Sequence, residues 1–317
     1  MKKPAAANEV RGVSDRSADR SLHNTPIPTS TSSLSADQGI DSHAVGVTAA
    51  ASRRVGKLEL DVIRMSLNHR DRQIIGSLHQ HRFLTTTAIE QWHFADHASP
   101  LTAARTSRRV LARLRELGVV TTLERDKGGN RGGSAQHVWH LTVVGSRLVP
   151  GKQGKRVREP STAFLRHEMG VAQVHLDLIS AERDAKLRLI DFTAEPACWR
   201  TFPGASGQVV TLKPDFFASF AAHEEYESIV FGEYDNGTES LRTIQKKALV
   251  YENYWRTGLE VRRSGTFPKV WWIAPNRTRL DRILQELGRT AAITMALHAF
   301  ATPTTVVELM LQQEEPA

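Results

Sequence analysis

The chain has 317 residues, of which 40% are hydrophobic and 24% are charged, and this composition is typical of a soluble globular protein with room for two domains. It contains one cysteine, Cys198, which excludes a disulfide framework or a zinc site of several cysteines within the chain. No apolar run approaches the roughly 18 residues that a membrane span needs. The basic start Met1-Lys2-Lys3 is not followed by an apolar stretch, so the sequence predicts a cytoplasmic protein without a signal peptide.

Charge is distributed unevenly along the chain. Residues 1–160 hold 25 Lys and Arg against 14 Asp and Glu, a net charge of +11, whereas residues 161–317 hold 17 against 20, a net charge of −3. A basic region attracts polyanions such as nucleic acid. We therefore assign the binding of double-stranded DNA to the first half.

Residues 1–55 are rich in Ala, Ser, Thr, Asp and Arg and poor in large apolar side chains. Such a segment buries too little surface to offset the entropy that it loses on ordering. The sequence therefore predicts a disordered tail, with at most a weak, non-specific attraction to DNA.

Residues 56–150 combine helical apolar spacing with two short strands, which enclose a basic, glycine-rich loop at 126–134. The predicted elements are helices at 68–80, 85–92 and 99–117 and strands at 119–123 and 137–141. Gly118 is a natural stop for the third helix. Three helices followed by such a hairpin predict a winged-helix, that is, a winged helix-turn-helix, DNA-binding domain.

The third of these helices carries a row of arginines. Arginines on such a helix enter the major groove or clamp phosphates, and basic residues at the tip of the wing reach the neighbouring backbone. The candidate DNA-contacting residues are Arg105, Arg108, Arg109, Arg113, Lys127 and Arg131. The alternative is that the arginines form an ordinary solvated face of the helix.

Residues 151–160 predict a basic linker, and residues 161–317 predict a single α/β domain. Its expected elements are a helix at 161–182, strands at 187–192, 212–220 and 229–235, a helix at 240–255, a strand at 269–273, a helix at 277–287 and a strand at 292–300. The order helix–strand–strand–strand–helix–strand is that of the restriction-endonuclease-like core.

Three carboxylates occur in two of these apolar strands, namely Asp215, Glu233 and Asp235. Burying a charge is costly unless the charge is paired or binds a metal, and residues two apart on a strand share a face. The three acids would therefore meet at one point and hold a hard divalent cation such as Mg²⁺ or Mn²⁺. The alternative is two ordinary strands with acidic residues at their solvent ends.

Several motifs carry a family resemblance over about residues 65–290. They are His167, Lys213-Pro214-Asp215, Glu233-Tyr-Asp-x-Gly-Thr-Glu239 and Lys247-x-x-x-Tyr251. Together with the preceding winged helix, they resemble the replication-relaxation family, which is encoded largely on plasmids and other mobile elements. The resemblance implies a DNA-associated role in plasmid replication, relaxation or transfer, with replication or conjugation proteins as further partners.

The second half is also similar to the PD-(D/E)XK nuclease superfamily. Asp215 and Glu233 match its two acidic positions, but Asp235 stands where that superfamily usually has its catalytic lysine. Lys247, on the following helix, would supply the missing lysine and, with Asp215 and Glu233, complete a catalytic set. In the competing interpretation the fold is structural, and Lys247 only pairs with Asp235 or Glu233. His167 and Glu168 could also approach the acids, although packing or capping is the simpler role for both.

Three functions follow from these patterns. The first is a DNA-binding protein of a plasmid or other mobile element. The second is a Mg²⁺-dependent DNA nuclease or nickase directed by the winged helix. The third is a transcriptional regulator whose second domain senses a ligand.

Overall fold

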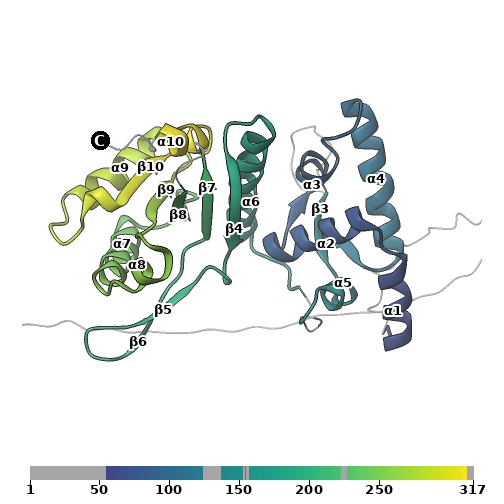
Figure 1. The fold of residues 1–317 in the computed structure, drawn as a ribbon, viewed down its shortest axis with the longest axis horizontal. Helices are drawn as coiled ribbons and strands as arrows, with labels where there is room; N and C mark the ends of the chain where they lie inside the picture. Colours follow the sequence, from purple (N-terminus) through teal and green to yellow (C-terminus); the bar gives the residue numbers. More distant parts are fainter. Residues whose placement is uncertain (1–54, 124–136, 153, 155–156, 223–226, 313–317) are drawn as a thin grey trace, which may run out of the picture. The chain divides into compact units, whose positions relative to one another are not determined.

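The computed structural model describes residues 55–123, 137–152, 154, 157–222 and 227–312 (Figure 1). The expected tail at 1–55 lies outside these residues except for Val55, and the expected wing loop lies wholly outside them.

Helices dominate the first half and surround a small sheet. Its elements, in chain order, are α1 (Lys57–Ser66), α2 (His69–His81), β1 (Leu84–Thr85), α3 (Thr86–His93), α4 (Pro100–Glu116), β2 (Val120–Thr122), β3 (Val138–Leu141) and α5 (Val143–Leu148). The strands are antiparallel in the order β1-β3-β2. The three helices and two strands expected from the sequence are therefore present, each within two residues of its expected ends.

Local sequence signals explain where these helices begin and end. The Asn68 side chain accepts a hydrogen bond from the Asp71 amide, and the Asp71 carboxylate accepts one from the Asn68 amide. The two bonds form a capping box at the start of α2. Ser99 caps α4 ahead of Pro100. Gly118 follows α4 with a φ of 70°, a conformation that glycine adopts at little cost.

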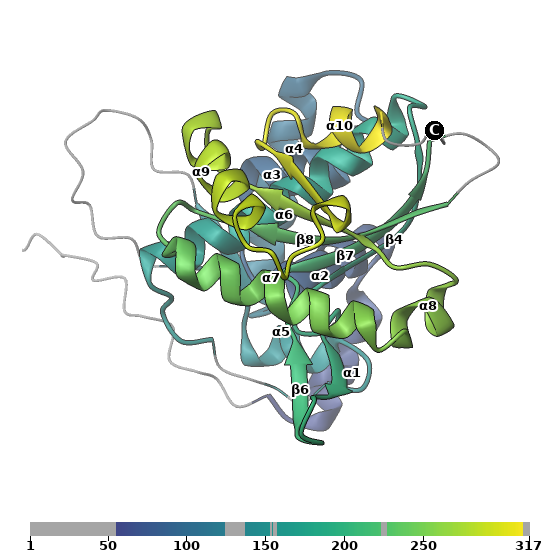
Figure 2. The same cartoon turned by 90° about the vertical axis from the view of Figure 1, so that its left-hand side faces the viewer.

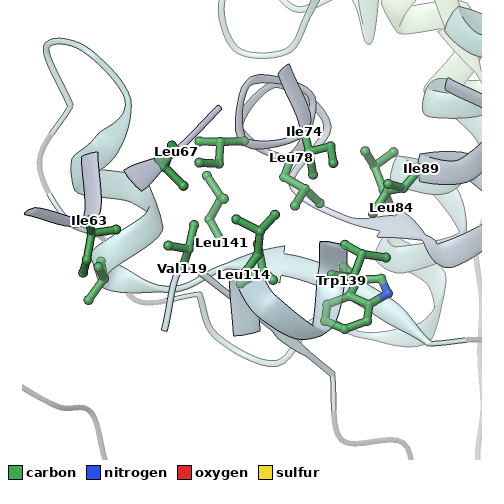
Figure 3. Packing of buried hydrophobic residues seen from close by; sticks show 14 of the residues in the cluster. Ile63, Leu67, Ile74, Leu78, Leu84, Ile89, Leu114, Val119, Trp139 and Leu141 are labelled. Atoms are coloured by element: carbon green, nitrogen blue, oxygen red, sulfur yellow. The ribbon is translucent and has the colours of Figure 1, made fainter. Parts of the chain in front are cut away.

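One apolar core joins the helices of the first half to its sheet. Figure 3 shows Leu78 of α2 and Leu114 of α4 packed with Leu141 and Trp139 of β3. The sequence did not predict α1, β1 or α5. All three elements are short, and α1 buries only Leu60 and Ile63. The alternation of apolar and polar residues therefore has too few repeats in them to be recognised.

The second half is a five-stranded sheet with helices on both faces. Its elements are α6 (Thr162–Arg183), β4 (Arg188–Ala194), β5 (Arg200–Pro203), β6 (Val209–Leu212), β7 (Phe216–Ala221), β8 (Ser228–Tyr234), α7 (Leu241–Arg256), α8 (Leu259–Ser264), β9 (Lys269–Ile273), α9 (Arg277–Gly288), η1 (Met295–Leu297), β10 (His298–Ala301) and α10 (Val306–Gln312). The main sheet has the order β10-β9-β8-β7-β4. β4, β7 and β8 run antiparallel, whereas β8, β9 and β10 run parallel.

The two faces of this sheet bury different helices. Apolar residues of α6 and α10 pack on one face, and those of α7 and α9 pack on the other; Figure 2 shows α7 and α9 in front of the strands. Trp271 lies in the first cluster and Trp272 in the second, as the alternation along β9 requires. Both tryptophans are therefore core residues, and the chain has the expected mixed α/β fold.

The structure corrects two of the expected strands. The stretch 212–220 is not one strand: β6 ends at Leu212 and pairs with β5, while β7 begins at Phe216. Pro214, which has no amide hydrogen for a ladder, lies in the break. The last strand covers only 298–301, after a short 3₁₀ turn. The β5–β6 hairpin, α8 and α10 were not expected.

The described residues all belong to one compact unit, and contacts between α2 and the second half contribute to it. His81 Nε2 lies 2.9 Å from His175 Nδ1 of α6, and the Gln80 side chain donates to the carbonyl of Phe192. The domain boundaries expected at 150 and 160 remain predictions. None of the helices in the described ranges is long and apolar enough to cross a membrane.

Candidate nucleic-acid interface and paired carboxylate site

The outer face of α4 is a basic surface. Arg105, Arg108, Arg109 and Arg115 are all exposed, and we call these four residues the arginine face. The opposite side of the helix is buried through Ala103, Ser107, Leu111 and Leu114. None of the four arginine side chains has a hydrogen bond or ion pair with any residue that the structure describes. Their charge is thus available to an external anion.

Arg113 differs from the arginine face. Its guanidinium forms an ion pair with Asp71, a carboxylate with no exposed surface. Asp71 also belongs to the capping box of α2, so Arg113 fixes α4 against the start of α2. We leave Arg113 out of the proposed DNA contacts for this reason. Lys127 and Arg131, the other predicted contacts, lie outside the described residues.

The second candidate site lies where β7 begins and β8 ends. Asp215 directly precedes β7, and its amide donates to the carbonyl of Gly232 in β8. Position 232 must be glycine, because a Cβ there would lie 2.0 Å from ring atoms of Phe216. This close approach sets Asp215 beside Glu233, the next residue of β8.

Asp215 is buried and both of its carboxylate oxygens have partners. Oδ2 accepts a hydrogen bond of 2.6 Å from the amide of Tyr234, and Oδ1 lies 3.2 Å from Nε2 of His167 on α6. Burial alone would lower the pKa of His167, but the hydrogen bond and the charge of Asp215 raise it to about 9. His167 is therefore a protonated partner of Asp215 at neutral pH.

Glu233 is paired with the lysine that the sequence singled out. Its Oε2 lies 3.1 Å from Nζ of Lys247, and its Oε1 accepts a hydrogen bond of 2.7 Å from the hydroxyl of Tyr251. The Lys247 ammonium also lies 3.0 Å from Glu239. Burial raises the pKa of Glu233, and the Lys247 charge opposes that rise. Burial lowers the pKa of Lys247, but the charges of Glu233, Asp215 and Glu239 raise it well above its usual range.

Asp235 forms an ion pair with a different cation, Arg279. Its Oδ2 lies 2.6 Å from Nε of Arg279 on α9, and its Oδ1 accepts a hydrogen bond from the Gly237 amide. Within the described part of the chain, no group of three or more His, Cys, Asp or Glu side chains is arranged to hold a metal ion. The structure thus brings Asp215, Glu233 and Lys247 together, but it does not add Asp235 as a third ligand.

Three further ionisable residues, Arg82, Glu168 and Glu195, extend the site toward the first half, and the sequence analysis singled out only Glu168. Arg82, at the end of α2, lies 3.1 Å from Glu168 and 3.3 Å from Glu195. Burial raises the pKa of Glu168 to about 7, while Arg82 opposes the rise. Arg82 has a φ of 59°, a strained conformation for a residue other than glycine. The position of the Arg82 side chain depends on long-range packing, so no local sequence pattern predicts its contacts.

The described residues define a mixed α/β protein in which a basic helix face accompanies a buried set of paired carboxylates. A family model described as replication-relaxation matches residues 75–270, more than half of the chain. The chain belongs to the replication-relaxation family, which confirms the resemblance drawn from its motifs. No curated protein and no solved structure matches it.

Proposed function

We propose that this protein binds double-stranded DNA through the arginine face of α4 and so serves the replication, relaxation or transfer of a plasmid or other mobile element. The observation that carries the proposal is the set of four exposed arginines without a partner in the described chain. Membership of the replication-relaxation family supports a role in replication. A surface of this kind gains most of its affinity from contacts with phosphates.

The element order around α4 supports the same proposal. Helices α2, α3 and α4 precede the β2 and β3 strands, and β1 completes their sheet. In a winged-helix domain this order presents the third helix to the major groove. We assign that role to α4, with Lys127 and Arg131 of the connecting loop as contacts to the flanking backbone.

The test is the affinity of the full chain for a labelled duplex of about 30 base pairs, long enough for a typical specific interface. The triple variant Arg105→Ala, Arg108→Ala, Arg109→Ala should lower the affinity about a hundredfold or more, since each arginine contact contributes about 1–3 kcal/mol. The control triple Arg242→Ala, Lys246→Ala, Arg282→Ala removes the same charge from exposed positions of α7 and α9. Equal losses in the two triples would contradict the assignment to α4.

A metal-dependent DNA nuclease is the second candidate, and the burial of Asp215 and Glu233 where β7 begins and β8 ends favours it. The Lys247–Glu233 pair fits this role and a purely structural one equally well. Mg²⁺ is commonly held by one or two carboxylates together with waters and substrate phosphates. The buried, adjoining Asp215 and Glu233 fit this donor set, whereas Asp235 does not, because Arg279 already binds it. When bound, the ion would activate water and neutralise charge on the phosphate. Lys247 would remain beside the carboxylates and steady the developing negative charge.

Incubation of supercoiled plasmid with the protein and Mg²⁺ or Mn²⁺ tests this candidate. Nicking by the wild type that disappears in both Asp215→Asn and Lys247→Met would establish the nuclease. The melting temperature gives a readout independent of cleavage, since a bound cation stabilises the folded state by mass action. No nicking and no metal-dependent shift would leave the carboxylates with a structural role only.

The regulator alternative uses the same arginine face. Enrichment of bound sites at promoters in the host genome would favour it, and enrichment at a plasmid origin would favour the replication role.

A further inference from the structure

The outward face of α4 has a regular composition. Arg105, Arg108, Arg109 and Ala112 follow one another at i, i+3, i+4 and i+7, which places them on one side of the helix. All four are exposed, and the buried residues of α4 lie on the opposite side. This outward stripe is therefore the part of the helix that would project furthest into a groove.

The crowding of like charge on this stripe has a physical cost. Arg105 lies three and four residues from Arg108 and Arg109, and like charges at these separations repel each other on a helix. The first acid after them, Glu116, lies at the end of α4. Elsewhere in the same helix Arg113 is neutralised by Asp71. Repulsion within the stripe would be relieved by an anionic surface.

The side-chain types on the stripe restrict which base edges it can read. Arginine donates two parallel hydrogen bonds to N7 and O6 of guanine, whereas adenine is read by Asn or Gln, and cytosine by Asp or Glu. No Asn, Gln or Asp occurs anywhere in α4, and its one glutamate, Glu116, is the last residue of the helix and lies beyond the stripe. The methyl side chain of Ala112 permits close approach and offers an apolar contact to the methyl group of thymine.

We propose that Arg105, Arg108 and Arg109 read guanines in the major groove, and that the preferred duplex carries at least two guanines within one helical turn. Arg115, one turn nearer the C-terminal end of α4 than Ala112, contacts phosphate and carries no sequence information. This inference rests on the proposed function, because it specifies the DNA that the arginine face selects.

Selection from a random duplex pool with the full-length protein identifies the preferred sequence. That sequence is then prepared with 7-deazaguanine at each guanine, which removes the N7 acceptor and preserves base pairing. Each effective replacement should weaken binding about tenfold, the scale of a lost bidentate contact. Arg105→Ala should abolish the difference between guanine and 7-deazaguanine at one position, whereas Arg115→Ala should weaken binding to both duplexes equally.

Two negative results are distinguishable. Binding that enriches no guanine, or that is unchanged by 7-deazaguanine, overturns the base-reading inference and leaves the DNA-binding role in place. Absence of binding to any duplex at low salt overturns the proposed function and the inference with it. Alanine is the best helix former, so α4 should persist in these variants, and an unchanged circular dichroism spectrum would verify that it does.

Discussion

Charged side chains have different environments on the arginine face of α4 and at the carboxylate site, where β7 begins and β8 ends. On α4, four exposed cations have no partner within the described chain. At the carboxylate site, Asp215, Glu233 and Asp235 are buried, and each has its own cation, His167, Lys247 and Arg279 respectively. Exposed charges without partners need a ligand from outside to be useful, whereas buried pairs already contribute within the fold. The difference supports the proposal that an external anion binds to α4.

The two regions should therefore respond to mutation differently. A change in the arginine face should alter binding and leave stability nearly unchanged, since exposed positions away from special features usually shift stability by less than about 0.5 kcal/mol. A change at the carboxylate site should alter stability first, because removal of one partner leaves a buried charge uncompensated.

The largest effect on stability is expected for Lys247→Met, which leaves Glu233 buried without its ammonium partner. We expect a loss of about 2–3 kcal/mol, below the usual cost for a fully buried pair, because 34% of the Lys247 side chain is exposed. The matched control is Lys246→Met, the exposed neighbour on the same helix, which should change stability little. Urea unfolding measures both, and equal effects would contradict the buried pairing.

A smaller effect is expected for Asp71→Asn, which converts Arg113 into an arginine without an ionic partner. The asparagine keeps some capping ability, so a loss of about 1–2 kcal/mol is expected from the lost charge-assisted hydrogen bond. Duplex affinity should stay the same or rise, because a further cation of α4 becomes available. A large fall in affinity at unchanged stability would show that Arg113 itself belongs to the DNA contact.

The smallest effect on stability is expected from pH, through the buried pair of His81 on α2 and His175 on α6. Burial lowers the pKa of His81 to about 3, and burial together with His81 lowers the pKa of His175 to about 2. The unfolded chain therefore takes up protons first as the pH falls, so each histidine reduces stability below about pH 6.5 by up to about 1.4 kcal/mol per pH unit. In His175→Gln this contribution disappears.

Unfolding curves of the wild type and His175→Gln at about pH 8 and about pH 5.5 check the sign. The stability of the wild type relative to the variant should fall by about 1 kcal/mol over that interval. A constant difference would mean that His175 is protonated or solvated in the folded state.

Much of the fold could be predicted because its long elements carry repeated signals. Helix α4 has a serine cap, helical apolar spacing and a terminal glycine, and β8 and β9 are continuous apolar runs between polar segments. The short elements α1, α5 and α8 were missed because six to ten residues contain too few repeats. The break between β6 and β7 was missed although Pro214 marks it, since apolar residues continue on both sides.

The sequence indicated which residues lie near the candidate site, but not which cation pairs with each carboxylate. The strand spacing and the helical position of Lys247 predicted that Asp215, Glu233 and Lys247 lie near one another, and the structure pairs Lys247 with Glu233. Spacing also placed Asp235 with them, but Arg279 from α9 binds that carboxylate, and no local pattern could anticipate a partner 44 residues away. The contacts of Arg82 with Glu168 and Glu195 span 86 and 113 residues and depend on the packing of α2 against the second half.

The central claim is that the arginine face of α4 binds double-stranded DNA, and the salt dependence of binding tests it most directly. For the full-length wild type, the logarithm of the binding constant should fall linearly with the logarithm of salt concentration, because each neutralised phosphate releases about 0.9 counterion. The triple variant Arg105→Ala, Arg108→Ala, Arg109→Ala should show a smaller slope, by up to about 3, because each positive charge removed from the groove lowers the number of counterions released, even where its hydrogen bonds go to a base. Identical slopes for wild type and variant, or a wild type whose binding does not respond to salt, would contradict the account.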